Sequence, residues 1–235
     1  MKKAGILLAM LIIGHEGYSC TTCNPQVQEK IYNSTFFPNL LTMLSPFIVL
    51  TVLVGILAFL STKKYKTNIA AGSGDKISNP IPLTASAMVL GIGIGGFIDG
   101  IALHQILQWH EMLSNKIPPI TVESKSVNMF WDGIFHAFTL AVVVTGVVLL
   151  WRLLPRKDID RSGKIFIGGL LSGWGLFNIV EGIINHHLLK LHNVREIIYN
   201  VDTWNFSFLG LSGVILIVGF ALIGQRLIAK RTFKS

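Results

Sequence analysis

The chain has 235 residues, of which 51% are hydrophobic and only 14% are charged. Soluble domains carry about 25% charged residues, so this composition excludes an ordinary soluble protein and indicates one that crosses a membrane several times. The formal net charge is +8, but no stripe of basic and aromatic residues runs along the sequence. A nucleic-acid partner is therefore not expected, and the lipid bilayer is.

The N-terminal segment 1–19 has the pattern of a signal peptide. Lys2 and Lys3 precede the apolar run 4–14, which is too short to span a bilayer. Small residues then lead up to Cys20, so the mature chain could begin there.

Two cysteines, Cys20 and Cys23, lie in the segment 20–38, which we expect to be extracytoplasmic. Their Cys-x-x-Cys spacing suits a small disulfide, a thiol redox couple or a ligand pair for a soft metal, and the sequence leaves these alternatives open.

Five apolar runs reach the length of about 20 residues that a membrane-spanning helix needs. They cover residues 39–61, 84–109, 130–153, 165–189 and 204–228. The first is a separate helix, and the other four form a membrane core over 81–230 as two hairpins, 84–153 and 165–228. The expected fold class is therefore an all-α polytopic membrane bundle.

Basic residues gather in three places along the chain: between the first and second spans, between the third and fourth, and after the fifth. Cytoplasmic loops carry the excess of Lys and Arg in membrane proteins. The N-terminus of the mature chain is then expected outside and the C-terminus in the cytoplasm.

Nine ionisable residues lie within or at the ends of the spans, and this topology places them all towards the outer face. Ionisable side chains are costly in a membrane and are usually paired, coordinated or functional there. They are Asp99, His104, His110, Asp132, His136, Glu181, His186, His187 and His192.

An internal repeat relates the two hairpins. The segment from Asp99 through His104 to His110 aligns without a gap on the segment beginning at Glu181, 82 residues later. Both segments begin with an acid, Gly and Ile, and both have histidines five and eleven residues after the acid. Because the two segments run in the same direction, the hairpins should be related by an axis along the membrane normal.

Ideal α-helical geometry limits which of these residues can meet. Asp99 and His104 would point about 140° apart at 100° per residue. Small residues let membrane helices approach closely, and Gly93, Gly96 and Gly100 share one face of the second span. We therefore expect this face to pack against the corresponding glycines of the fourth span, Gly168, Gly175 and Gly182, so that the acid of one helix approaches the histidine of the other.

The residue types predict a transition-metal site, because imidazole and carboxylate are ligands of copper, zinc, iron and manganese. Copper is favoured, with His104, His136 and His186 as the central imidazoles. The acids Asp99, Asp132 and Glu181 would be ligands or would orient them. His110 and His192, at the helix ends, would be interfacial residues or an entry site. Haem b, a hydrogen-bonded structural network and a proton relay remain alternatives.

Three runs of the sequence resemble a known family: Gly-Gly-Phe-Ile-Asp99-Gly-Ile-Ala-Leu-His104, Asp132-Gly-Ile-Phe-His136, and Asn178-Ile-Val-Glu181-Gly-Ile-Ile-Asn185-His186-His187. The family is that of the uncharacterised bacterial predicted membrane proteins grouped as a domain of unknown function. The resemblance covers residues 85–225 and implies a membrane fold and a location in the bacterial inner membrane. It also suggests company with cytochrome oxidase assembly proteins of the copper-handling kind.

The spacing Asp132-x-x-x-His136 is similar to that of copper ligands in a membrane subunit of particulate methane monooxygenase.

Two functions follow from these patterns. In the first, the protein binds copper and delivers it to a copper-dependent oxidase or a copper chaperone, with Cys20 and Cys23 as the transfer pair. In the second, it is a membrane-embedded metal- or haem-dependent oxidoreductase.

Overall fold

The structure is a computed structural model, which describes residues 24–70, 79–196 and 198–232. The predicted signal segment and the pair Cys20 and Cys23 lie outside these residues. Within them the fold is all-helical, as predicted, with six α-helices and two π-helical segments. Five helices are long and apolar enough to cross a membrane.

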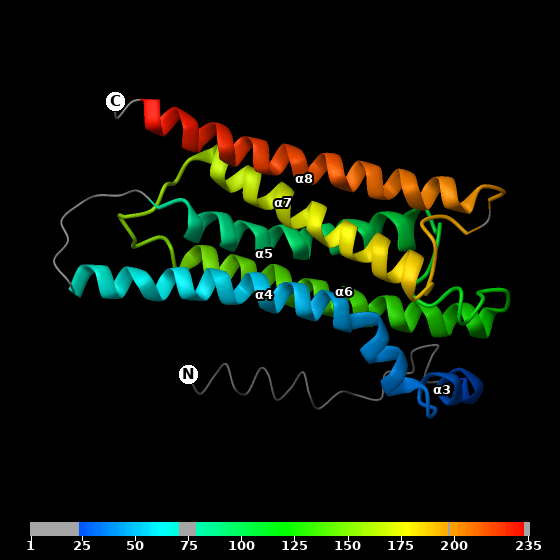
Figure 1. Ribbon diagram of the computed structural model, residues 1–235. Coiled ribbons are helices and arrows are strands. Elements are labelled where there is room, and N and C mark those ends of the chain that lie inside the picture. The colour runs from blue at the N-terminus through cyan, green and yellow to red at the C-terminus, as the bar shows by residue number, and fades with distance from the viewer. Residues whose placement is uncertain (1–23, 71–78, 197, 233–235) are drawn as a thin grey trace, which may run out of the picture.

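Figure 1 shows the long helices side by side, with their connections at two opposite ends. A short helix, α3 (Pro25–Ile31), precedes α4 (Phe36–Ala70). The four core helices are α5 (Ile81–Ile98), α6 (Val122–Trp151), α7 (Gly163–Val180) and α8 (Val201–Thr232). The apolar spans therefore agree with the sequence prediction, although α6 begins eight residues before the predicted start at 130.

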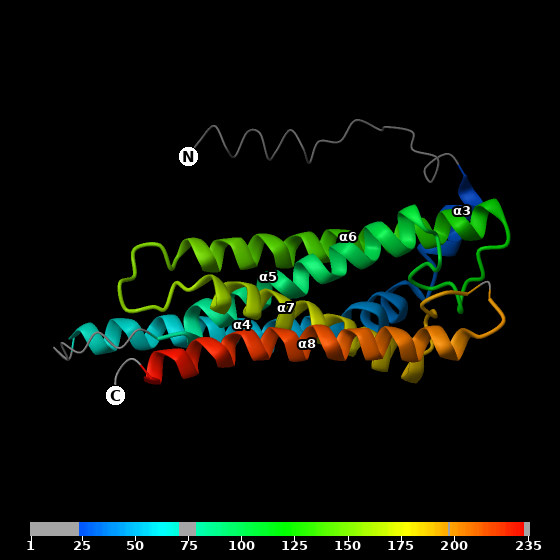
Figure 2. The same cartoon turned by 90° about the horizontal axis from the view of Figure 1, so that it is seen from above.

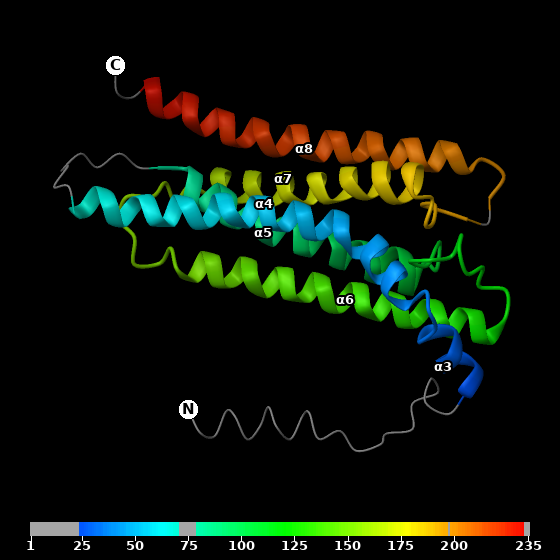
Figure 3. The same ribbon diagram turned by 60° about the horizontal axis from the view of Figure 1, so that its bottom comes forward.

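The core is built around the pair α5 and α7, with α6 against α5 and α8 against α7. Figure 2 shows α6 and α8 on opposite sides of this central pair. Helix α4 lies along the bundle and contains Pro46; Figure 3 shows its bend near the N-terminal end. Phe47 of α4 anchors the helix on the core, because its ring stacks 4.8 Å from that of Phe177 and lies 5.7 Å from that of Phe135.

Glycines do allow α5 and α7 to pack closely, but not the glycines that the helical pattern predicted. A side chain at Gly91 would overlap the backbone of Leu170, and one at Gly173 would overlap the backbone of Met88. Gly93 and Gly175, which were expected at this contact, instead face α6 and α8. The prediction was wrong because each central helix has two close neighbours and uses separate glycine faces for them.

Each central helix widens into a π-helix at the same end of the bundle. The segment η1 (Asp99–Ile106) continues α5, and η2 (Glu181–Leu188) continues α7. Both begin at the acid of the repeated motif. π-Helical turns inside α-helices are rare and occur frequently at functional sites. This end of the bundle is therefore the candidate location of the functional site.

The opposite end is held by polar contacts between connections. Arg226 on α8 lies 3.1 Å from Asp160, and Arg161 donates to the carbonyls of Leu154 and Arg156. Arg156 binds Asp158 through two nitrogens. The basic residues that the sequence assigns to the cytoplasm include these arginines.

Candidate metal centre

Six buried residues from both hairpins form one cluster at the π-helical end. None of them is more than 5% exposed. They form three overlapping groups whose ligand atoms lie within 4.8 Å of one another. We name these the imidazole group (His104, His110, His192), the second-hairpin group (Glu181, His186, His192) and the carboxylate group (Asp99, His104, Glu181).

The π-helices bring each acid to the histidine five residues later. His104 Nε2 lies 3.0 Å from Asp99 Oδ2, and Glu181 and His186 belong to one group. The expected separation of about 140° assumed an α-helix, but the i to i+5 repeat of a π-helix places such residues one above the other. That part of the geometric prediction was therefore wrong. The acid of the second hairpin also reaches His104 across the helix contact, as expected.

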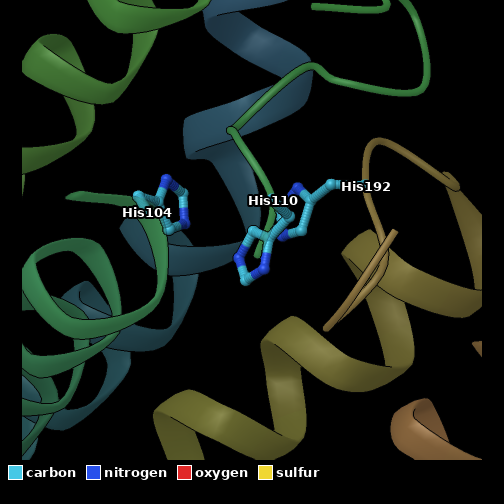
Figure 4. Close-up of side chains that lie close together, drawn as sticks. All are labelled: His104, His110 and His192. Carbon is cyan, nitrogen blue, oxygen red and sulfur yellow. The ribbon is translucent and has the colours of Figure 1, made fainter. Parts of the chain in front are cut away.

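The loops after the π-helices fold back and bring two further histidines inward. Gln108 and Lys190, which occupy equivalent positions in the two loops, adopt left-handed backbone angles, with φ of 50° and 48°. Such angles are uncommon outside glycine and cluster at functional sites. His110 and His192, expected at the interface, instead lie in the cluster, where their rings stack 4.6 Å apart. Figure 4 shows the two rings side by side, with His104 beside them.

The two loops hold these imidazoles in a reciprocal way. His110 Nδ1 lies 2.9 Å from the carbonyl oxygen of Val194, and His192 Nδ1 lies 3.0 Å from that of Met112. A carbonyl oxygen can only accept, so both Nδ1 atoms must carry a proton. In the neutral ring, each Nε2 then has a free lone pair.

Asp132 of α6 orients the third imidazole of the imidazole group. Its Oδ1 lies 2.9 Å from His104 Nδ1 and also accepts from the backbone N–H of Met112 at 2.9 Å. On α8, Asn205 Oδ1 accepts from the equivalent N–H, that of Val194, at 3.0 Å. The two hairpins therefore make matching loop contacts, but the α6 residue is a carboxylate that also reaches an imidazole, whereas its α8 counterpart is an amide.

Many ligand atoms of the cluster are buried and lack hydrogen-bond partners among the described residues. These atoms are Nε2 of His104, His110 and His192, both ring nitrogens of His186, and both carboxylate oxygens of Asp99 and Glu181. Two of these nitrogens lie close to carboxylates, His104 Nε2 at 3.0 Å from Asp99 Oδ2 and His192 Nε2 at 3.6 Å from Glu181 Oε1, and each contact is an ion pair only when the imidazole is protonated. Buried polar atoms are normally satisfied, so this concentration calls for an explanation such as a bound ion.

Burial favours the neutral form of the loop histidines. Loss of solvent lowers the pKa of His192 to about 4 and lowers the pKa of His110 well below its ordinary value. Burial also raises the pKa of two loop acids, that of Glu111 to about 7 and that of Glu196 above its usual range. Glu196 accepts a hydrogen bond from Ser114, which joins the two loops.

The comparisons with known proteins place this cluster within one family. Residues 86–226 match the model of a family described as "Predicted membrane protein (DUF2243)". The chain belongs to this family. The match contains all nine predicted ligand residues and begins after Cys20 and Cys23. Comparisons with curated proteins and with solved structures found no match.

Two of the family-region histidines lie outside the three groups. His136 Nε2 packs against the backbone at Gly100, and the ring contacts that of Phe97. His187 Nδ1 donates a hydrogen bond to the carbonyl oxygen of Gly182 at 2.6 Å. The structure therefore places neither histidine in a ligand group, although the sequence pattern predicted His136 as one of the central imidazoles.

Sequence reasoning missed the residues that position the loops. Asn128 accepts from the N–H of Leu113 and donates to the carbonyl of Ile117. Asn205 and the backbone carbonyls of Met112 and Val194 were also not identified. Asparagines near the starts of α6 and α8 were the available signal, because buried amides usually anchor backbone groups.

An apolar cavity of about 580 Å³ lies beside the cluster, between α5, α7 and α8. Asp99 is its one charged lining residue. Three tryptophans also line it: Trp109, Trp174 and Trp204. Arg195 lies over two of these rings, 5.3 Å from the centre of Trp109 and 5.1 Å from that of Trp204.

Proposed function

We propose that this protein is an integral membrane metalloprotein that holds a transition-metal ion in the buried cluster as a resident cofactor. The observation that carries the proposal is the gathering of buried ligand atoms in the six-residue cluster that make no hydrogen bond among the described residues. In His104, His110 and His192 the protein already engages Nδ1, which leaves Nε2 for an ion. Metal-binding histidines characteristically use one nitrogen for the ion and the other for a carboxylate or carbonyl.

The donor set supports copper, zinc or iron. Imidazole nitrogen suits all three metals, and carboxylate oxygen can complete their coordination. We favour copper, as the sequence suggested. Haem b fits less well, because the rings of His104, His110 and His192 lie 4.4 to 5.9 Å from one another. That packing gives no space for a porphyrin between them.

Burial of the ligands favours a resident ion over one in transit. The ligands are shielded from water, since His104, Glu181 and His192 are at most 3% exposed, and such shielding slows exchange of a bound ion. Delivery of copper to an oxidase or a chaperone depends on Cys20 and Cys23, which lie outside the described residues, and it stays a prediction. A resident ion instead predicts slow release to a chelator, unchanged by replacing both cysteines with serine.

A second function, that of a membrane-embedded oxidoreductase, is favoured by the cavity beside Asp99. Its apolar, tryptophan-rich lining suits a lipid-soluble substrate, and binding sites of this kind combine apolar walls with a few polar groups. The cavity would bring such a substrate next to a cluster residue. This function requires the resident ion and adds to it a reaction on a molecule from the bilayer.

The orientation that goes with these proposals places the cluster towards the outer face of a bacterial inner membrane. Support comes from the basic residues at the opposite end, including Arg156, Arg161 and Arg226, because such residues favour the cytoplasmic side.

Metal analysis of the purified full chain tests the central proposal. Protein from cells supplied with copper, zinc and iron is isolated in mild detergent, and its metal content and visible spectrum are recorded. We expect bound metal in the wild type and in the control His187→Gln, and a loss in His192→Gln. A hydrogen-bonded network or proton relay predicts no metal in any of the three, with lowered thermal stability in His192→Gln alone.

A further inference from the structure

The three groups of the cluster cannot all be filled together, because they share residues. The imidazole group and the second-hairpin group share His192, and the imidazole group and the carboxylate group share His104. Each of these histidines has its Nδ1 engaged by the protein, which leaves only Nε2 for an ion. One lone pair cannot bind two ions, so the imidazole group excludes both of the others.

The remaining combination has no such conflict. The carboxylate group and the second-hairpin group share only Glu181, and a carboxylate has two oxygens. Both oxygens are buried and lack hydrogen-bond partners among the described residues. A carboxylate can therefore bridge two ions, which in two-metal sites lie about 3.5–4 Å apart.

We propose that the cluster holds two transition-metal ions bridged by Glu181. One ion is bound by Asp99, His104 and one Glu181 oxygen, and the other by the second Glu181 oxygen, His186 and His192. The proposal rests on the proposed function and specifies the number and arrangement of its ions.

The arrangement uses equivalent residues of the two hairpins. Each ion takes an acid at the start of a π-helix and the histidine five residues after it. Burial of two cations requires nearby negative charge. Asp99 and Glu181 supply part of it directly, and Asp132 supplies more through His104; a bridging hydroxide would complete the balance for two divalent ions.

His110 separates the two-ion arrangement from a single ion in the imidazole group. It belongs to neither group of the bridged pair, although its ring lies 4.4 Å from that of His104 and 4.6 Å from that of His192. A single ion in the imidazole group would instead need His110 and would not need Glu181. Substitutions at His110 and Glu181 therefore have opposite expected effects.

The test titrates the metal-stripped full chain in detergent with copper(II), and a parallel sample with zinc(II), and counts bound ions by mass spectrometry. We expect two ions per chain in the wild type, in His110→Gln and in the control His187→Gln, but at most one in Glu181→Gln. Electron paramagnetic resonance of the copper sample should show a signal well below its copper content, because carboxylate-bridged copper(II) ions couple magnetically.

One ion per chain with a full copper signal, lost in His110→Gln and kept in Glu181→Gln, would overturn the bridged pair and leave the proposed function standing. Binding of neither metal would overturn both. If Glu181→Gln does not fold, the ion count and signal of the wild type decide, since they do not depend on any variant.

Discussion

At the scale of single residues, the cluster combines fixed imidazole orientations with ligand atoms that make no hydrogen bond among the described residues. The Nδ1 atoms of His110 and His192 are fixed by carbonyls of the opposite loop, and Asp132 fixes His104. Chemistry-bearing residues could be identified from the sequence because ionisable side chains stand out in apolar spans. The partners of their nitrogens could not, because two of the three are backbone carbonyls and any residue type supplies one.

The charge of Asp132 can be tested without disturbing the loop that it holds. In Asp132→Asn the amide oxygen can still accept from the N–H of Met112, as Asn205 does from Val194. Loss of the negative charge should make the His104 imidazole a weaker ligand and lower metal affinity by about 10–100-fold. Competition titration against a chelator measures the change. Unchanged affinity would show that Asp132 only anchors the loop.

Glu111 should make stability depend on pH. Burial raises its folded-state pKa from 4.5 to about 7, with nearby Asp132 adding to the shift and Lys125, 3.9 Å away, opposing it. A raised pKa means that the stabilisation is complete below 4.5 and is lost as pH rises through about 7. Thermal unfolding in detergent between pH 5 and 8 should therefore show a falling midpoint in the wild type and a flatter one in Glu111→Gln. Parallel curves would contradict this.

At the scale of elements, the ends of α5 and α7 are the parts of the fold that the sequence predicts least well. The apolar spans identify α5 and α7, but nothing in Asp99–Ile106 or Glu181–Leu188 distinguishes a π-helix from an α-helix. The acid and histidine five residues apart are therefore placed on different faces by α-helical geometry. The fold-back of the loops depends on Gln108 and Lys190, which are not glycines and so give no signal of their left-handed angles.

The contact between α5 and α7 should not tolerate a methyl group. A Cβ at Gly91 would lie 2.9 Å from the carbonyl carbon of Leu170, so Gly91→Ala should destabilise the bundle by about 1–3 kcal/mol. Gly133→Ala is the matched control, because a Cβ there meets nothing within 4 Å and alanine favours a helix by about 0.5–1 kcal/mol. Thermal unfolding of both variants in one detergent measures the difference. Equal unfolding midpoints in the two variants would show that Gly91 does not lie at a tight contact between α5 and α7.

At the scale of the whole molecule, hydropathy was sufficient for the number of spans and for the all-α class. Spans must be about 20 apolar residues long, so the sequence reports them directly. It does not report which helices are central. The pairing of α5 with α7 depends on Gly91 and Gly173, and several other glycines show the same spacing without lying at that contact.

The proposed orientation can be measured by labelling introduced cysteines. In a chain with Cys20 and Cys23 replaced by serine, Ile120→Cys lies at the cluster end, where Ile120 is 87% exposed, and Lys157→Cys lies at the basic end. A membrane-impermeant maleimide should label Ile120→Cys in intact spheroplasts, and Lys157→Cys only after permeabilisation. The reverse pattern would place the cluster on the cytoplasmic side.

The most direct test of the central claim is X-ray absorption at the metal edge of the protein as purified. We predict an ion surrounded by nitrogen and oxygen at about 2.0–2.2 Å, with the outer scattering that imidazole rings give. The absence of a stoichiometric metal, or a first shell dominated by sulfur at about 2.3 Å, would contradict a resident ion in the cluster of His104, His192 and Glu181.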